Sequence, residues 1–200
     1  MTGQETKHVA FDADTETSDE ALLLNFANGD ATAARLLTAR LAPRALGYAA
    51  RVLGDRAEAE DVTQEAMLRL WKIAPEWRQG EAKVSTWLYR VTANLCTDRL
   101  RKRRTVDLDA VPEPLDDTAS VEEQMQSAAR NLALEAALKT LPERQRQAVV
   151  LRHLEGLSNP EIADVLNITV EAVESLTARG KRALAAALAG RRDELGYTDD

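Results

Sequence analysis

Residues 157–182 contain the signals for two helix N-termini, separated by one sharp turn. Ser158 and Glu161 have the spacing of a capping box, which begins a helix. Asn167 tolerates the left-handed backbone that ends this helix, and Thr169 can cap a second one directly afterwards. The pattern predicts a helix-turn-helix, whose second helix usually enters the major groove of DNA. An ordinary helical hairpin would give a similar pattern and is the alternative.

The rest of the chain is also patterned for helices. No run of β-branched residues alternates with polar ones over a useful length, so we expect an all-α protein. Two hundred residues suit two small helical domains, an N-terminal bundle and a C-terminal helix-turn-helix, joined by a flexible acidic linker. Cys96, the only cysteine, has no second cysteine or nearby histidine as a partner, so we expect a small hydrophobe and no metal site.

The acidic charge is concentrated outside the predicted domains. The chain has a formal net charge of −7, whereas DNA-binding proteins are normally basic. Residues 1–20, 105–127 and 193–200 carry −5, −7 and −4, which leaves +9 for the remainder. We therefore predict a disordered acidic tail over 1–18, a linker over 105–127 and a second acidic tail over 193–200.

The two predicted domains span residues 19–104 and 128–192. In the first domain, one helix is expected over 20–26 and another over 31–53, the latter interrupted at Pro43 because proline lacks the N–H that a helix interior needs.

Asp55 can cap the next helix, which runs to about residue 73 and has two distinct faces. Its apolar positions are Val62, Ala66, Leu70 and Ile73, and its polar positions are Asp61, Gln64, Glu65, Arg69 and Lys72. The polar face suits a docking surface for another protein, with Gln64 supplying hydrogen bonds that solubility alone does not require. A plain solvated helix face is the alternative.

A loop over 74–84 precedes a helix that Ser85 can cap and that ends in a basic run at Arg104. We expect inward positions at Trp87, Leu88, Val91 and Leu95, and outward positions at Tyr89, Arg90, Asn94, Asp98 and Arg101. The basic run is sufficient for several phosphate contacts, and Trp77 in the loop is an unpaired aromatic that could stack on an unstacked base. This combination favours single-stranded nucleic acid; a core helix with a solvated cationic end is the alternative.

No catalytic constellation is present in the sequence. We find no phosphate-cradling glycine loop, no histidine beside a nucleophile and no cluster with metal-ligand spacing, so we expect no enzyme, no cofactor and no small-molecule substrate. No apolar stretch approaches the length of a membrane span, so we expect a cytoplasmic protein without membrane insertion.

Several separated motifs resemble one family. Asp-Val-Thr-Gln-Glu-Ala-Met-Leu-Arg-Leu-Trp at 61–71, Thr-Trp-Leu-Tyr-Arg-Val-Thr-Ala-Asn at 86–94 and Leu-Pro-Glu-Arg-Gln-Arg at 141–146 precede the helix-turn-helix. In this order and spacing they resemble the extracytoplasmic-function (ECF) sigma factors of bacterial RNA polymerase, which belong to the sigma-70 superfamily. The likeness covers about residues 20–190. It implies a non-enzymatic initiation factor that binds core polymerase and directs it to promoters, as in stress responses.

The resemblance also implies roles for individual residues. The region 2 domain, residues 19–104, would dock on the polymerase and melt the −10 element. Its expected contacts with the β′ clamp helices are Asp61, Gln64, Glu65 and Arg69. Its expected contacts with the −10 single strand are Trp77, which helps capture a flipped base, Asn94 and Asp98 at the base pocket, Tyr89 and Arg90 on the strand-separating helix, and Arg101.

The region 4 domain, residues 128–192, would read the −35 duplex and meet the β flap. Its expected DNA contacts are Ser158, Thr169, Glu171, Ala172, Glu174, Ser175, Arg179, Lys181 and Arg182. Family members commonly carry basic residues along the recognition helix where this chain has Glu174 and Leu176. Glu171 and Glu174 could accept a hydrogen bond from cytosine N4, or they could weaken −35 binding; both interpretations stay open.

The family implies regulation by an anti-sigma factor, because a free sigma factor would compete continually for polymerase. The acidic linker resembles the connector that threads the polymerase near its active-site cleft. Two other functions are compatible with the residues alone: a stand-alone helix-turn-helix regulator that acts without polymerase, and a pure protein–protein adaptor.

Overall fold

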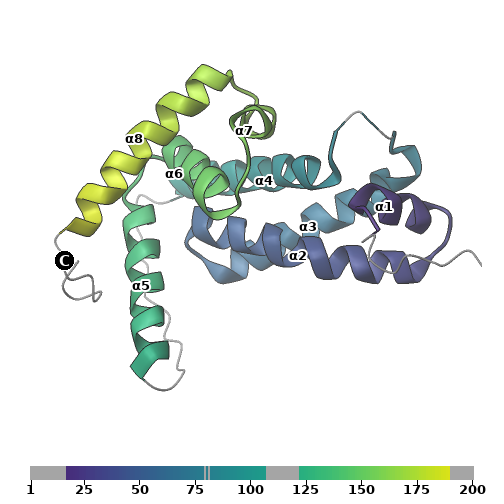
Figure 1. Cartoon of the computed structure of the whole chain (residues 1–200), viewed down its shortest axis with the longest axis horizontal. Helices are drawn as coiled ribbons and strands as arrows, with labels where there is room; N and C mark the ends of the chain where they lie inside the picture. Colours follow the sequence, from purple (N-terminus) through teal and green to yellow (C-terminus); the bar gives the residue numbers. More distant parts are fainter. Residues whose placement is uncertain (1–16, 79, 81, 107–121, 190–200) are drawn as a thin grey trace, which may run out of the picture.

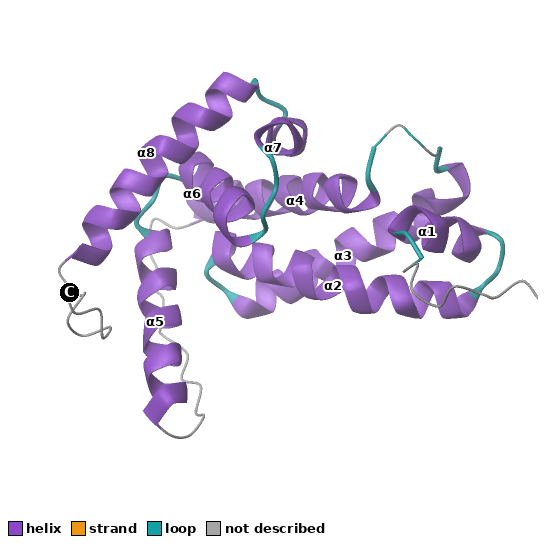
Figure 2. Cartoon of the chain, viewed as in Figure 1, coloured by secondary structure: helices purple, strands orange, loops and turns teal. Residues whose placement is uncertain are grey.

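The protein is described by a computed structural model, which covers residues 17–78, 80, 82–106 and 122–189. Every regular element in these ranges is a helix (Figure 2), which confirms the all-α prediction. The predicted acidic tails lie almost wholly outside these ranges. Most of the predicted linker, residues 107–121, also lies outside them.

The N-terminal module consists of α1 (Asp19–Ala27), α2 (Ala31–Leu53), α3 (Arg56–Ile73), the short 3₁₀ helix η1 (Ala74–Glu76) and α4 (Val84–Val106). Side-chain caps begin α2 and α3, since the Asp30 carboxylate accepts from the N–H of Thr32 at 2.8 Å and Asp55 accepts from that of Glu58 at 2.9 Å. Gly54, at φ 67°, closes α2 in the left-handed conformation.

Two sequence predictions about helix boundaries are wrong. The helix is not interrupted at Pro43, because buried Leu37, Leu41 and Ala45 hold α2 against the core on both sides of the exposed proline. The long helix α4 begins at Val84 rather than being capped by Ser85. Its first N–H is satisfied from outside the segment, since the Glu20 carboxylate on α1 accepts from Val84 at 3.1 Å.

The C-terminal module consists of α5 (Glu122–Lys139), α6 (Glu143–Val149), the π-helical turn η2 (Val150–Leu154), α7 (Asn159–Leu166) and α8 (Val170–Ala189). Helix α5 begins inside the stretch that the sequence predicted as linker. In Figure 1, α5 points away from the rest of the molecule, whereas α6, α7 and α8 cluster together.

The predicted helix-turn-helix is present as α7 and α8. The capping box is complete: Ser158 Oγ accepts from the N–H of Glu161, and the Glu161 carboxylate accepts from the N–H of Ser158 at 2.9 Å. Asn167 adopts φ 52° and ψ 54°, and Thr169 Oγ1 accepts from the N–H of Ala172 at 3.2 Å. Val173 is fully buried at the crossing of the two helices.

The two modules pack against each other and share one core. Figure 1 shows α7 lying beside α4, and α6 lying over the C-terminal ends of α4 and α2. The buried residues of both modules form a single cluster that runs from Leu22 on α1 to Val173 on α8. The predicted pair of domains is therefore closed into one body among the residues that the structure describes.

Candidate promoter and polymerase interface

The predicted polymerase-docking residues lie together on the outer face of α3. Asp61, Gln64 and Arg69 are exposed, and Glu65 is half-buried beside Arg69, with which it forms an ion pair. The Asp61 carboxylate lies 3.7 Å from the guanidinium of Arg99 on α4 and remains 65% exposed. The opposite face is buried as expected, with Val62, Ala66 and Leu70 fully inaccessible.

An apolar groove runs between α2 and α3 beside this polar face. It encloses about 640 Å³ and is lined mainly by apolar side chains, among them Leu46, Met67, Leu68 and Trp71, with Gln64 at its edge. Leu68, which lines the groove, is 61% exposed. The sequence alone did not predict this groove, because its walls come from two helices, although Leu68 and Trp71 lie beside the polar positions of α3.

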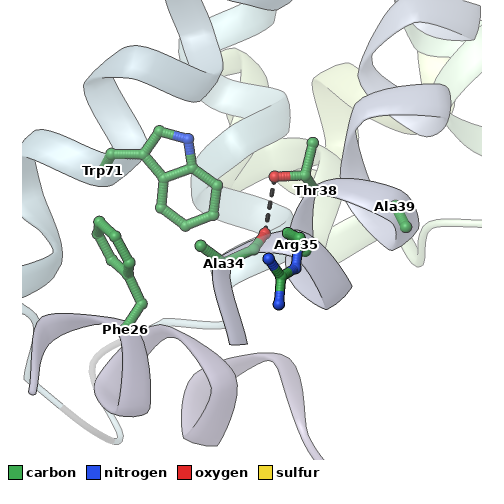
Figure 3. A pocket seen from close by; sticks show the side chains of 6 residues that line it. All are labelled: Phe26, Ala34, Arg35, Thr38, Ala39 and Trp71. Carbon is green, nitrogen blue, oxygen red and sulfur yellow. Dashed lines mark hydrogen bonds between the residues drawn. The ribbon is translucent and has the colours of Figure 1, made fainter. Parts of the chain in front are cut away.

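A second hollow of about 480 Å³ continues the groove toward α1. Figure 3 shows Phe26 and Trp71 on one side of it and the α2 residues Ala34, Arg35 and Thr38 on the other. The two rings meet edge to face with centroids 4.8 Å apart. The groove therefore has an aromatic end formed by the contact of α1 with α3.

Four of the predicted −10 residues form one outward stripe along α4. Arg90, Asn94, Asp98 and Arg101 recur at the three- and four-residue spacing of one helix face, and all are exposed. Arg101 donates to the Asp98 carboxylate at 2.9 Å, so the cation is held within the stripe.

The expectation that Tyr89 faces outward is wrong. Tyr89 is only 3% exposed, and its hydroxyl donates to the Glu155 carboxylate of the C-terminal module at 2.6 Å. Its ring meets Tyr48 of α2 edge to face at 5.8 Å. Burial and the hydrogen bond to Glu155 together raise the pKa of Tyr89 well above its usual value. Tyr89 thus lies under the C-terminal module in this structure.

Trp77 is not the unpaired aromatic that the sequence predicted. It packs against the core from the loop after η1, and its ring meets Trp87 of α4 edge to face at 6.1 Å. Its Nε1–H is buried and has no protein acceptor. The indole is therefore held in place by packing against its apolar neighbours.

The basic end of α4 is largely neutralised by acidic neighbours. Arg103 donates to Glu58 at 3.0 Å and to the carbonyl of Leu53, which fixes the end of α4 to α2 and α3. Arg104 pairs with Glu143 of α6 at 2.9 Å. The run therefore offers fewer free cations for phosphate than its sequence indicates.

The predicted −35 residues lie on and around α8. Thr169, Glu171, Glu174, Ser175, Arg179, Lys181 and Arg182 are exposed, whereas Ser158 and Ala172 are half-buried. A hydrogen bond from its own backbone N–H, at the helix N-terminus, lowers the pKa of Glu171. The amide of Asn159 reaches the Glu174 carboxylate at 3.5 Å. The basic residues Arg179, Lys181 and Arg182 lie further along the helix.

Three residues to which the sequence assigned no role, Arg146, Gln147 and Glu155, join the two modules. Arg146 of α6 donates to the carbonyl of Val52 on α2 at 2.6 Å, and Gln147 donates to the Thr97 hydroxyl on α4 at 3.0 Å. The Glu155 carboxylate accepts a hydrogen bond from the Tyr89 hydroxyl. Gln147 is fully buried, yet nothing in a helical pattern separates a buried glutamine from an exposed one, so the sequence carried no signal for it.

Within the described ranges, no group of three or more histidine, cysteine or acidic side chains is arranged to hold a metal ion. No helix in the same ranges is both long and apolar enough to cross a membrane.

Comparison with known proteins identifies both modules. Residues 37–106 match the family model for sigma-70 region 2, and residues 131–184 match that for sigma-70 region 4. The chain is 36% identical over 76% of its length to the ECF RNA polymerase sigma factor SigE of Mycolicibacterium smegmatis, of which the match spans 60%. It is 36% identical to SigM of Mycobacterium tuberculosis and 32% identical to the RNA polymerase sigma-H factor of Pseudomonas aeruginosa, over 88% and 95% of those proteins.

Two solved structures share the arrangement of helices. One is CnrH in complex with the cytosolic domain of CnrY, at 28% identity and a TM-score of 0.64, covering 87% of this chain and 99% of that one. The other is the sigma factor RpoE with the anti-sigma factor NepR from Bartonella quintana, at 20% identity and a TM-score of 0.61, covering 78% and 96%. With both region models matched in order and relatives aligned over most of their length, this chain belongs to the ECF sigma factors of bacterial RNA polymerase, non-enzymatic proteins that direct transcription initiation.

Proposed function

We propose that this sigma factor docks on core polymerase through the outer face of α3 and the groove beside it. The observation that carries the proposal is the juxtaposition of exposed Asp61, Gln64 and Arg69 with an apolar groove that leaves Leu68 largely in solvent. A polar rim around an apolar hollow is the usual anatomy of a protein interface. The β′ clamp helices are the expected partner for this face, and the β flap is expected to meet the C-terminal module.

The docking proposal is tested by measuring affinity for purified core polymerase. Asp61→Ala combined with Gln64→Ala should weaken binding at least about tenfold, since loss of interface hydrogen bonds costs about 1–3 kcal/mol. The matched control replaces an exposed acid and amide elsewhere, Glu135→Ala with Asn131→Ala on α5, and should bind normally. Equal affinity of the two double variants would refute the assignment.

For the promoter, the proposal assigns the −10 strand to the α4 stripe and the −35 duplex to α8. The stripe supplies Arg90, Asn94, Asp98 and Arg101, and the loop supplies Trp77. Tyr89 is assigned to the same strand-separating helix once the C-terminal module has left it. Glu171 and Glu174 remain the positions where −35 recognition departs from a purely basic helix.

Strand opening and duplex binding can be separated experimentally. Both properties are measured with the holoenzyme on promoter fragments selected from genomic DNA, strand opening by permanganate reactivity. Asn94→Ala leaves the buried core untouched, and it should reduce strand opening more than duplex binding. Arg179→Ala with Arg182→Ala should do the reverse and flatten the salt dependence of binding. Equal losses in both assays from either variant would overturn the division of roles.

An anti-sigma factor is the expected regulator, supported by the solved RpoE relative, which is bound to one. The cytoplasm is the expected location, because core polymerase and the chromosome lie there. Affinity capture of the tagged chain from cells should recover both core polymerase and a dedicated inhibitor; repeated recovery of polymerase alone would count against the inhibitor.

A further inference from the structure

Helix α8 turns one fixed side toward the rest of its module. Val173 on this side is fully buried, and Gly180, seven residues further on, lies against α6 with no room for a Cβ. Figure 1 shows α8 at the edge of the C-terminal module, with α6 and α7 on its inner side. Because these contacts fix the rotation of α8 about its axis, they also decide which side chains its outer face presents.

The outer face of α8 is a single stripe whose two halves differ in charge. Its members recur at three- and four-residue spacing and are all exposed: Glu171, Glu174, Ser175, Ala178, Arg179 and Arg182. In a helix-turn-helix, the N-terminal residues of the second helix contact the base edges. The first two turns of α8 supply two acids and no cation, so this end of the helix is suited to hydrogen-bond donors rather than to phosphate.

The first acid, Glu171, is engaged at the start of its own helix. Its carboxylate accepts hydrogen bonds from its own backbone N–H and from the Thr169 hydroxyl. Thr169 Oγ1 in turn accepts from the N–H of Ala172 at 3.2 Å, so the three residues form one cap. The Glu171 oxygens are therefore turned back toward the backbone that they cap.

The second acid, Glu174, lies one turn further along and is held less tightly. The amide nitrogen of Asn159, the first residue of α7, lies 3.5 Å from Glu174 Oε1. A hydrogen bond of that length is weak, so it keeps the carboxylate near the start of α7 without occupying it fully. Glu174 is thus the acid of the stripe that remains available to a donor outside the protein.

The four bases differ in what they offer a carboxylate. In the major groove only cytosine N4 and adenine N6 are donors, whereas guanine and thymine present acceptors. Adenine also carries the N7 acceptor beside its donor, and this atom repels a carboxylate, which can only accept. Cytosine has no acceptor beside N4, so it fits Glu174 best.

We propose that Glu174 selects a cytosine in the −35 element, and that Glu171 caps α8 without reading a base. The inference rests on the proposed binding of the −35 duplex by α8. It divides the work along the stripe: Glu174 supplies sequence preference, whereas Arg179 and Arg182 supply attraction to phosphate.

Base preference is measured by selection with the complete holoenzyme. Promoter fragments that wild-type holoenzyme retains from genomic DNA are randomised one base pair at a time across the upstream element, and the bound fraction is sequenced. Wild-type holoenzyme should favour C·G at one pair by about tenfold, and Glu174→Ala should lose this preference at that pair alone. Glu174→Gln should change the preference to adenine, because an amide offers the acceptor and donor that adenine N6 and N7 require.

Glu171→Gln is the matched control, since it makes the same change one turn earlier, and it should leave the selected sequence unchanged. Both positions are exposed, so these substitutions leave the core intact. A cytosine preference that survives Glu174→Ala, or one that Glu171→Gln shifts, would overturn the assignment. So would uniformly tighter binding by Glu174→Ala with unchanged preferences, because the carboxylate would then only repel DNA. Absence of any upstream preference in wild-type holoenzyme would instead refute the proposed −35 role of α8.

A modified base tests the hydrogen bond itself. N4-methylcytosine still pairs with guanine, but its methyl group replaces the hydrogen that cytosine N4 directs into the major groove. At the selected pair it should weaken binding by wild-type holoenzyme about fivefold or more and leave binding by Glu174→Ala unchanged, since that variant has already lost the contact. Equal weakening of both proteins would overturn the proposed hydrogen bond.

Discussion

Gly180 lies where α8 crosses α6, and the space around it admits no side chain. A Cβ there would fall 2.5 Å from Val149 Cγ2 and 3.3 Å from the Gln145 carbonyl oxygen. Alanine normally stabilises a helix by about 1 kcal/mol relative to glycine. We expect Gly180→Ala to lower the free energy of unfolding instead, by about 1–3 kcal/mol, because overpacking strains the crossing.

Urea denaturation of Gly180→Ala measures this cost, and Gly47→Ala on α2 is the matched control. A Cβ at Gly47 would fall 2.9 Å from Arg51 Nη1, the end of a flexible side chain that can move, and 3.9 Å from Glu155 Oε1, which is an ordinary contact. The control should therefore lose less stability than Gly180→Ala. If the two variants were equally stable, close approach of α6 and α8 would not be the reason for glycine at position 180.

Cys96 is chemically inert in the folded protein. It is fully buried, and desolvation by burial raises the pKa of its thiol to about 12. Because the thiolate is the reactive species, its maleimide labelling at pH 7 should be at least about a hundredfold slower than that of a Lys72→Cys thiol on the exposed face of α3. Rapid labelling of wild-type protein before denaturation would contradict the burial of Cys96 and open a redox role that we otherwise exclude.

At the scale of elements, α7 depends on the charge of Glu161. Hydrogen bonds from Lys83 and Ser158 lower the pKa of this carboxyl to about 2, from 4.5. Folding therefore favours the ionised form, and the stabilisation is complete above pH 4.5 and lost as the pH falls toward 2. Glu161→Gln keeps the capping-box geometry but loses the charge, so its melting temperature should be below wild type at pH 7 and converge with it near pH 2.

The control for this titration is Asp164→Asn, an exposed acid on the same helix. Its melting temperature should follow wild type across the range. A Glu161→Gln difference that persisted unchanged at pH 2 would show that shape, not charge, matters at this position.

Helix boundaries were predictable wherever a cap is local. Ser158, Asn167 and Asp55 act within four residues of themselves, so the sequence shows what each one satisfies. The effect of Pro43 could not be predicted because the burial that keeps α2 continuous is supplied by other helices. Tyr89 was misread for the same reason: periodicity places it on a face of α4, but its partner is 66 residues further along the chain.

At the scale of the whole molecule, the shared core predicts that both modules unfold together. All three tryptophans, Trp71, Trp77 and Trp87, lie in the N-terminal module, so their fluorescence reports on that module alone. Far-ultraviolet circular dichroism reports on the helices of both. Since one buried cluster runs through both modules, the two probes should give the same melting temperature for the wild-type chain.

Replacing Glu155 should separate the unfolding transitions of the two modules. Glu155→Ala leaves Tyr89 and Arg51 without their shared partner, so the interface weakens while each module keeps most of its own packing. The circular dichroism melt of this variant should then begin at a lower temperature than its fluorescence melt, whereas exposed Glu135→Ala should keep the curves coincident. If the contacts between the modules dominate the stability of both, their continuous core must also unfold cooperatively. Separate transitions in the wild-type chain would therefore show that the modules are not coupled.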